Sequence, residues 1–179
     1  VQAAVKIPVD VTPGSYTLAG LPFTVAASPA ARPLIRLDTG GADIQAALDA
    51  GNDVHLLPGS YGLSSVLRMP AHSQLHGSGR DCTRLVREID GDYAERMIVP
   101  ANGCTVSDLT LLNARDDSYA FHGNGAENVN IVRVRFSCGF LGEWQQSGLL
   151  LRDCLFERCG AHQLTSNVLL HRCRFVDGG

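Results

Sequence analysis

An apolar pattern that recurs about every 20 residues restricts the fold of this chain more than any other feature of its sequence. Within each repeat, apolar side chains fall at offsets 0, 2, 5 and 7 from the first residue. Four successive repeats begin at Cys104, Val129, Leu149 and Val168. Such alternation is typical of a half-buried strand, but one strand cannot bury its own apolar side chains. Each repeat must therefore be covered by its neighbours, as in a solenoid.

Two weaker repeats precede these four. Their residues at the same offsets are Val54, Leu56, Gly59 and Tyr61, followed by Leu75, Gly77, Arg80 and Cys82. In the full repeats, offset 15 carries Tyr119, Trp144 and Leu164, which predicts a second inward-facing column. The coils lack a helical segment and a leucine-rich signature, which favours a parallel β-helix. We therefore predict an all-β, single-stranded parallel β-helix with about 20 residues per coil.

The N-terminal part differs from the repeats. Residues 1–37 contain short β-prone runs broken by Pro and Gly, so we expect an irregular β arm there. Helical spacing of apolar residues predicts a short helix at about 42–50, with Gly51 placed to end it. This helix would cap the open end of a β-helix over 38–179. The repeats stop within a coil, so we expect the β-helix to be incomplete at its C-terminal end or covered by another chain.

The composition of the chain argues against two classes of partner, nucleic acid and a membrane. Its net charge of −3 gives no basic field for nucleic acid. No run of 18 apolar residues occurs, so no membrane span is predicted. The first residues lack a signal-peptide pattern, as those of a mature secreted chain also would.

The six cysteines do not demand a disulfide framework. Cys104, Cys154 and Cys173 occupy offsets that hold aliphatic residues in other repeats, so we expect them to be buried thiols. Such thiols fit folding in a reducing compartment. Cys138 and Cys159 lie near predicted strand ends, and their redox state stays open.

Outward positions support the same register. Offset 4 of the four full repeats carries Asp108, Arg133, Asp153 and Arg172 in turn. On adjacent rungs about 4.8 Å apart, these side chains would form a column of alternating charge. Neighbouring pairs would attract weakly, so we interpret the column as structural.

The sequence resembles the pectate-lyase-like right-handed parallel β-helix superfamily. The resemblance rests on a D-I-Q-A-A helix at Asp43–Leu48, an L-P-x-G-x-Y strand at Leu57–Tyr61 and an L-x-G-x-G-x-x-x-T segment at Leu75–Thr83. It extends over residues 38–179 and implies a right-handed coil. Members of the superfamily include pectate lyases, alginate epimerases, polygalacturonase-like hydrolases and phage tailspikes. The resemblance thus implies a polysaccharide ligand, although these motifs cap and turn the β-helix and carry no chemistry.

The richest polar stretch is NARDDSYAFHGNG, residues 113–125. A uronate lyase or epimerase needs a base to remove the C5 proton and a cation to stabilise the enolate. On this hypothesis His122 is the base, Arg115 neutralises the uronate, and Asp116 and Asp117 bind Ca²⁺ in a lyase. No other metal or cofactor is expected. The alternative is a solvated turn, because Asn, Asp and Gly are common in turns.

The alignment of successive repeats also suggests a groove lined by polar side chains. Asp117, Gly142 and His162 share offset 13, and Glu143 follows by one residue. Asp117, Glu143 and His162 would then line one groove, and a carboxylate pair about 5–10 Å apart would also suit glycoside hydrolysis. Trp144 would stack on a sugar if it pointed outward, whereas its column favours core packing.

Two functions follow from these observations. The first is a phage tailspike-like or other virion-associated structural protein that binds surface polysaccharide, as a homotrimer or with other virion proteins. The alternative is a polysaccharide lyase or epimerase acting on uronate-containing glycans. The expected location is the virion or the extracellular space.

Overall fold

The computed structural model describes most of the chain. The described residues are 14–18, 21–25, 32–38, 40–88, 96–113, 119–123, 125–142, 148–161 and 168–176. They fall into two compact units, Val1–Ala31 and Arg32–Gly179. In the first unit, β1 (Gly14–Leu18) and β2 (Leu21–Val25) form an antiparallel hairpin.

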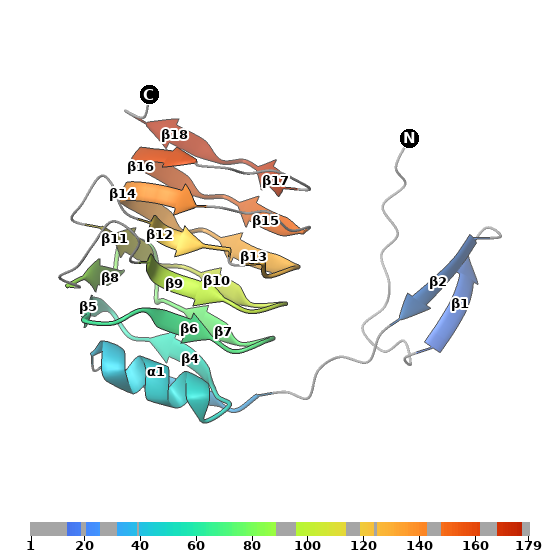
Figure 1. Cartoon of the computed structure of the whole chain (residues 1–179), viewed down its shortest axis with the longest axis horizontal. Helices are drawn as coiled ribbons and strands as arrows, with labels where there is room; N and C mark the ends of the chain where they lie inside the picture. The colour runs from blue at the N-terminus through green and yellow to red at the C-terminus, as the bar shows by residue number, and fades with distance from the viewer. Residues whose placement is uncertain are drawn as a thin grey trace. The chain divides into compact units, whose positions relative to one another are not determined.

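The second unit is a parallel β-solenoid in which strands of successive coils lie side by side (Figure 1). The strands of its first sheet are β3 (Leu34–Leu37), β4 (Asp53–Leu56), β7 (Gln74–His76), β10 (Thr105–Ser107), β13 (Val129–Val132), β15 (Leu149–Arg152) and β17 (Val168–His171). All of its strand pairs are parallel. The chain is an all-β, right-handed parallel β-helix, as predicted.

A second sheet of nine strands forms the rest of each coil. We call its two parts the proximal half, which directly follows the first sheet along the chain, and the distal half, which comes after it. The proximal half contains β5 (Gly59–Leu63), β8 (Thr83–Arg87), β11 (Thr110–Leu112) and β18 (Arg174–Val176). The distal half contains β6 (Leu67–Met69), β9 (Arg96–Pro100) and β12 (Tyr119–His122). The long strands β14 (Arg135–Gly142) and β16 (Leu155–Ala161) start in the proximal half, and β14 continues along β12. The second sheet therefore bends where β14 passes from one half to the other.

The stacking predicted for the four full repeats is confirmed. Val129 pairs with Leu149, and Leu149 pairs with Val168. Val129 and Leu149 are buried, and they belong to one core cluster that runs through the coils. Each coil therefore buries the apolar face of the next, which explains how strands with charged residues between their apolar positions form a core.

Aromatic rings form one of these columns in the proximal half. The Phe156 ring stacks on Phe136 at 4.8 Å and on Phe175 at 4.6 Å between ring centroids, with nearly parallel planes. Phe136 and Phe156 are buried, whereas Phe175 is 50% exposed. Phe175 and the exposed Leu170 belong to the last described coil, whose apolar column positions no further described coil covers.

The register predicted for the two weaker repeats is confirmed at their first residues, because Val54 pairs with Leu75, and was wrong elsewhere. Leu75 pairs with Val106, two residues beyond the predicted Cys104. In the next column, Leu85 takes the position predicted for Cys82, and Cys82 is exposed. The connection length causes this second difference, because six residues separate β7 from β8 and two separate β10 from β11. A single set of offsets therefore cannot describe both the weaker repeats and the full ones.

One helix, α1 (Gly41–Asp49), covers the N-terminal end of the coils (Figure 1). Ile44 and Leu48 are fully buried. The Gln45 side chain donates to the Arg68 carbonyl at 3.0 Å and accepts from the Arg68 amide at 2.8 Å. Gln45 thus occupies backbone groups of β6, the strand at the edge of the distal half. No helix in the described part of the chain is long and apolar enough to cross a membrane.

The β-helix begins earlier than the boundary predicted at residue 38. Strand β3 pairs in parallel with β4, and the compact unit starts at Arg32. The Arg32 side chain binds the Leu48 carbonyl at 3.2 Å and lies 3.4 Å from the Asp53 carboxylate. These contacts attach residues before 38 to the first coil.

The cysteines in core positions behave as small apolar residues. Cys104 and Cys154 are buried thiols, and Cys173 is half-buried. The Cys104 thiol donates to the Pro70 carbonyl at 3.0 Å. Burial raises the pKa of Cys154 to about 12, so this thiol stays protonated at neutral pH. Cys159 is also a buried free thiol, and the side chain of Cys138 lies outside the described residues.

Candidate functional site

The structure describes one residue of the predicted polar site. His122 ends β12 in the distal half of the second sheet. The other predicted site residues lie outside the described residues; they are Arg115, Asp116, Asp117, Glu143, Trp144 and His162. Their roles stay predictions. Within the described part of the chain, no group of three or more His, Cys, Asp or Glu side chains is placed to hold a metal ion.

Strand β12 brings a tyrosine and a histidine together. The Tyr119 and His122 rings meet edge-on, with centroids 5.4 Å apart and planes at 81°. Phe121 between them is fully buried in the core, so strand alternation directs His122 to the opposite side of the sheet. His122 is nevertheless only 3% exposed, whereas Tyr119 is half-buried. Tyr119 is therefore the more accessible member of the pair.

An arginine lies beside this pair on the neighbouring coil. Arg96 of β9 pairs in register with Tyr119, and in-register side chains on adjacent strands share one face of a sheet. Arg96 is half-buried, and its Nε is buried without a hydrogen-bond partner in the described part of the chain. Arg96 therefore adds a positive charge beside Tyr119.

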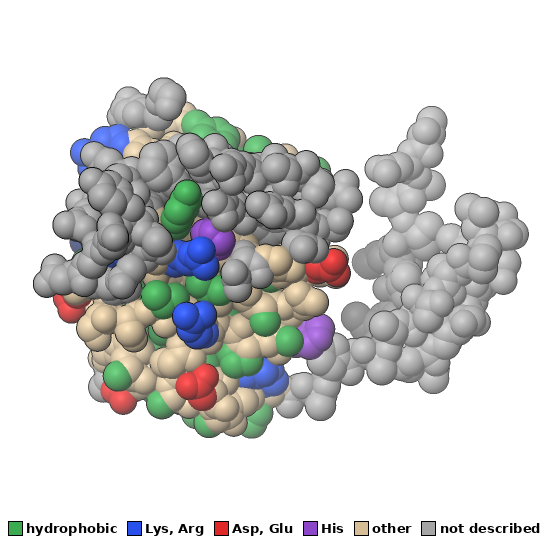
Figure 2. All heavy atoms as spheres, viewed as in Figure 1, with side chains coloured by type: hydrophobic (Ala, Val, Ile, Leu, Met, Phe, Trp, Pro, Cys, Tyr) green, Lys and Arg blue, Asp and Glu red, His purple; other side chains and the backbone are tan. Residues whose placement is uncertain are grey.

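The distal half also carries positive charge at its surface. Arg68 of β6 is exposed, and Figure 2 shows cationic side chains standing over β6 and β9 among polar and apolar ones. An anionic ligand approaching Tyr119 would thus meet positive charge on the earlier coils.

The register was wrong at one position of the predicted groove and at one position of the second inward column. His122, rather than Asp117, lies opposite Gly142, and Tyr119 lies opposite Phe140 rather than Trp144. Six residues separate β11 from β12, whereas two separate their partners Ser137 and Phe140 within β14. The four additional residues, with a register shift between Tyr119 and Phe121, displace β12 from a constant offset.

Sequence reasoning missed two members of this site. Tyr119 was assigned to an inward column because of its offset, and Arg96 was not singled out. The apolar run Met97–Val99 directly after Arg96 was an available sign of a strand, since these residues are buried in β9. The register of Arg96 with Tyr119 could not be read from the sequence, because it depends on the lengths of the connections between β9 and β12.

A second polar group surrounds His76 on the first sheet, and its side chains bind one another. The Nδ1 of His76 lies 2.7 Å from the Ser107 hydroxyl, and its Nε2 lies 2.9 Å from the Gln74 side-chain carbonyl. Burial lowers the pKa of His76, an effect that outweighs the nearby carboxylates of Asp108 and Asp53. Because both ring nitrogens already have partners, we assign His76 no role in binding.

The comparisons with known proteins identify the fold. No protein-family model and no curated protein matches the chain. Among solved structures, the A-module of Azotobacter vinelandii mannuronan C-5 epimerase AlgE6 is similar with a TM-score of 0.56 and 20% identity, over 79% of this chain and 54% of that one. The AlgE4 A-module from the same organism gives 0.51 and 22%, over 77% and 50%. The chain has the pectate-lyase-like fold. It spans about half the length of these two epimerase modules.

Proposed function

We propose that this chain acts on polysaccharides that contain uronate residues, as an epimerase or a lyase. The contact of Tyr119 with His122, with Arg96 in register with Tyr119, is the observation that carries this proposal. The fold shared with two modules named mannuronan C-5 epimerases supports the same class of substrate. No comparable observation supports the tailspike-like interpretation, because neither similar structure is a tailspike.

The proposed chemistry begins at the carboxylate of the sugar. Arg96 donates to this carboxylate through its guanidinium, which stabilises the negative charge that builds up as the C5–H bond breaks. The C5 proton passes to a base on β12, and the electron pair of the bond moves into the carboxylate. Tyr119 is placed to meet the sugar because it is the more accessible ring, and the His122 ring packs edge-on against it. In this proposal Tyr119 takes the C5 proton and His122 holds the Tyr119 ring in position.

The fate of the intermediate separates the two reactions. In an epimerase, a proton returns to C5 from the opposite face, which inverts that carbon. In a lyase, the electron pair expels the sugar linked through the oxygen at C4, which leaves a C4–C5 double bond. Either reaction uses the same base and the same cation, so this arrangement of residues is compatible with both.

The test is an assay on a panel of uronate polymers. Proton NMR of polymannuronate and polyguluronate reports epimerisation, and ultraviolet absorbance reports the unsaturated product of a lyase. Tyr119→Phe and His122→Gln are each expected to lower the rate by about 10²–10⁴-fold. Arg96→Gln is expected to lower it by about 10²–10³-fold.

The matched control is His76→Gln, which changes a histidine on the first sheet and should leave the rate near that of the unaltered chain. Circular dichroism of each variant checks the fold. Unaltered rates in both β12 variants, or no product from any uronate polymer, would refute the proposal.

A further inference from the structure

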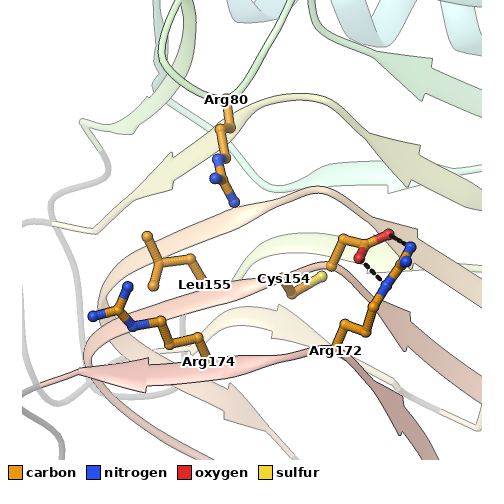
Figure 3. Close-up of a pocket in the computed structure, with 6 residues that line it drawn as sticks. Arg80, Cys154, Leu155, Arg172 and Arg174 are labelled. Atoms are coloured by element: carbon orange, nitrogen blue, oxygen red, sulfur yellow. Dashed lines mark hydrogen bonds and ion pairs between the residues drawn. The ribbon is translucent and has the colours of Figure 1, made fainter.

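A pocket opens at the corner where the first sheet turns into the proximal half, away from β12 in the coil. Its volume is about 310 Å³, near the lower end of the range for small-molecule sites. The lining residues are Arg80, Asp153, Cys154, Leu155, Arg172 and Arg174 (Figure 3). They come from the β7–β8 connection and from the turns and first strand residues of the last two described coils. The pocket therefore combines residues far apart in the sequence.

Positive charge is in excess in this pocket. Three guanidinium groups face one carboxylate, and the Asp153 carboxylate is already bound by Arg172 at 2.6 and 2.8 Å. The Arg80 and Arg174 guanidinium groups have no ion-pair partner among the residues that the structure describes. In Figure 3, Arg80 extends toward Leu155 and Arg174 lies on the other side of that side chain. Two unneutralised cations thus flank an apolar surface.

The backbone that carries Arg80 is held in place. The Thr110 hydroxyl donates to the Arg80 carbonyl, and the adjacent Asp81 carboxylate lies 2.9 Å from Arg135 of β14. The Gly79 amide also donates to the Asp108 carbonyl at 2.9 Å. These contacts attach the β7–β8 connection to the following coils, so the base of Arg80 is pre-positioned for a ligand.

We infer that this pocket binds the carboxylate of an acidic sugar, as an anchoring site apart from the catalytic face. Arg80 and Arg174 supply forked donors that match a carboxylate, and Leu155 supplies an apolar surface for the C–H face of a sugar ring. The free acceptor capacity of Asp153 suits a sugar hydroxyl. The identity of the polymer rests on the proposed function, whereas the carboxylate site rests on the pocket alone.

An anchor of this kind has a kinetic signature. A polymer bound at the corner raises the local concentration of its other sugars at β12. Loss of the anchor should therefore raise KM for a long polymer and leave kcat unchanged. Short substrates that cannot reach both places should show no change in KM.

The binding test follows the Leu155 methyl resonances by NMR, which reports this pocket even if ligand also binds elsewhere. The probes are a uronate trisaccharide, a neutral trisaccharide and inorganic phosphate, added to the unaltered chain and to Arg80→Gln and Arg174→Gln. The uronate should shift the Leu155 signals, and each substitution should weaken this binding by about 10- to 100-fold. Both arginines lack ion-pair partners among the described residues, so neither change should disturb the fold.

Matched controls separate the outcomes. Arg36→Gln, an exposed arginine of β3 outside the pocket, and Tyr119→Phe should both keep full uronate binding at Leu155. Equal binding of the neutral trisaccharide, phosphate binding as tight as uronate binding, or unaltered binding in Arg80→Gln would overturn the inference. Arginine-dependent binding by a chain without activity would support this site and refute the proposed function.

Discussion

The corner between the first sheet and the proximal half is regular, whereas the passage into the distal half is not. At the corner, β10 joins β11, β13 joins β14, β15 joins β16 and β17 joins β18 through two residues each. The first residue of each turn has positive φ; these are Asp108 (59°), Arg133 (54°), Asp153 (57°) and Arg172 (53°). On the other side, β11 and β12 are separate strands where the next coil has the single strand β14.

The difference shows what keeps a solenoid in register. A left-handed residue in a two-residue turn directs the chain from the first sheet into the second within a fixed length, so the following strand begins at a fixed offset. Arginine and aspartate pay a steric cost of about 1 kcal/mol in this conformation. Ion pairs partly offset that cost, because Arg133 binds Asp108 through two nitrogens at 2.5 and 2.7 Å. On the irregular side the connections β5–β6, β8–β9 and β11–β12 differ in length, and the candidate catalytic residues lie there.

Single-residue insertions are the strongest test of this contrast. A glycine inserted after Asp108 would shift β11 by one residue and turn Leu111 out of the core, which should cost at least about 4 kcal/mol. A glycine inserted after Asp116, between β11 and β12, should cost less than about 0.5 kcal/mol because it only lengthens the connection. Urea unfolding measures both. Equal costs at the two sites would contradict the contrast.

Shortening the aromatic column should have the next largest effect. Phe156→Ala removes a buried ring stacked on both sides and should lower the free energy of unfolding by about 3–5 kcal/mol. Phe156→Leu keeps most of the volume and should cost less than about 2 kcal/mol. Chemical denaturation checks both variants, and a cost below about 1 kcal/mol for alanine would mean that the column does not hold adjacent coils together.

Gly77 lies in the β7–β8 connection, which has six residues where the other described turns at this corner have two. A substitution there tests how closely this connection approaches the next coil. A Cβ at this position would lie 2.3 Å from the Asp108 carbonyl oxygen and 2.8 Å from the Leu109 Cβ. Gly77→Ala should therefore destabilise the chain by about 1–3 kcal/mol, since the backbone of the next coil cannot withdraw. Gly59→Ala is the matched control, because its Cβ would make ordinary contact with the Tyr61 ring. Similar urea midpoints for the two variants would rule out the close approach.

The ion pairs at the regular corner should have the smallest effect. Burial raises the pKa of Asp108, but hydrogen bonds from Arg133 and Ser107 outweigh it, so the folded pKa lies below its ordinary value. The resulting stabilisation is present above about pH 4 and is lost as pH falls through the folded pKa. It amounts to less than about 1 kcal/mol, because the Arg133 side chain is 51% exposed.

Asp108→Asn should accordingly flatten the loss of stability below about pH 4. The control is the double variant with Arg133→Gln, in which the two changes should not add, since either alone breaks the pair. Additive effects in urea unfolding at neutral pH would show that the pair contributes nothing.

The sequence predicts those parts of the molecule in which spacing is constant. The columns through Val129, Leu149 and Val168 and the alternating charges at the corner are found where the offsets placed them. Hydrophobic offsets cannot detect residues added to a connection, so Leu75 and Tyr119 were placed in the wrong columns. The Arg80–Arg174 pocket was also beyond reach, because its residues meet only after several coils are stacked.

The alternating charges at the corner restrict how such a chain can grow. Asp108, Arg133, Asp153 and Arg172 reverse sign from one coil to the next. Duplication of a single coil in the gene would set two like charges against each other at the junction, about 5 Å apart. Duplication of two coils together would preserve the alternation of charge in this column. A chain of this kind can therefore lengthen by two coils at a time without compensating substitutions in this column.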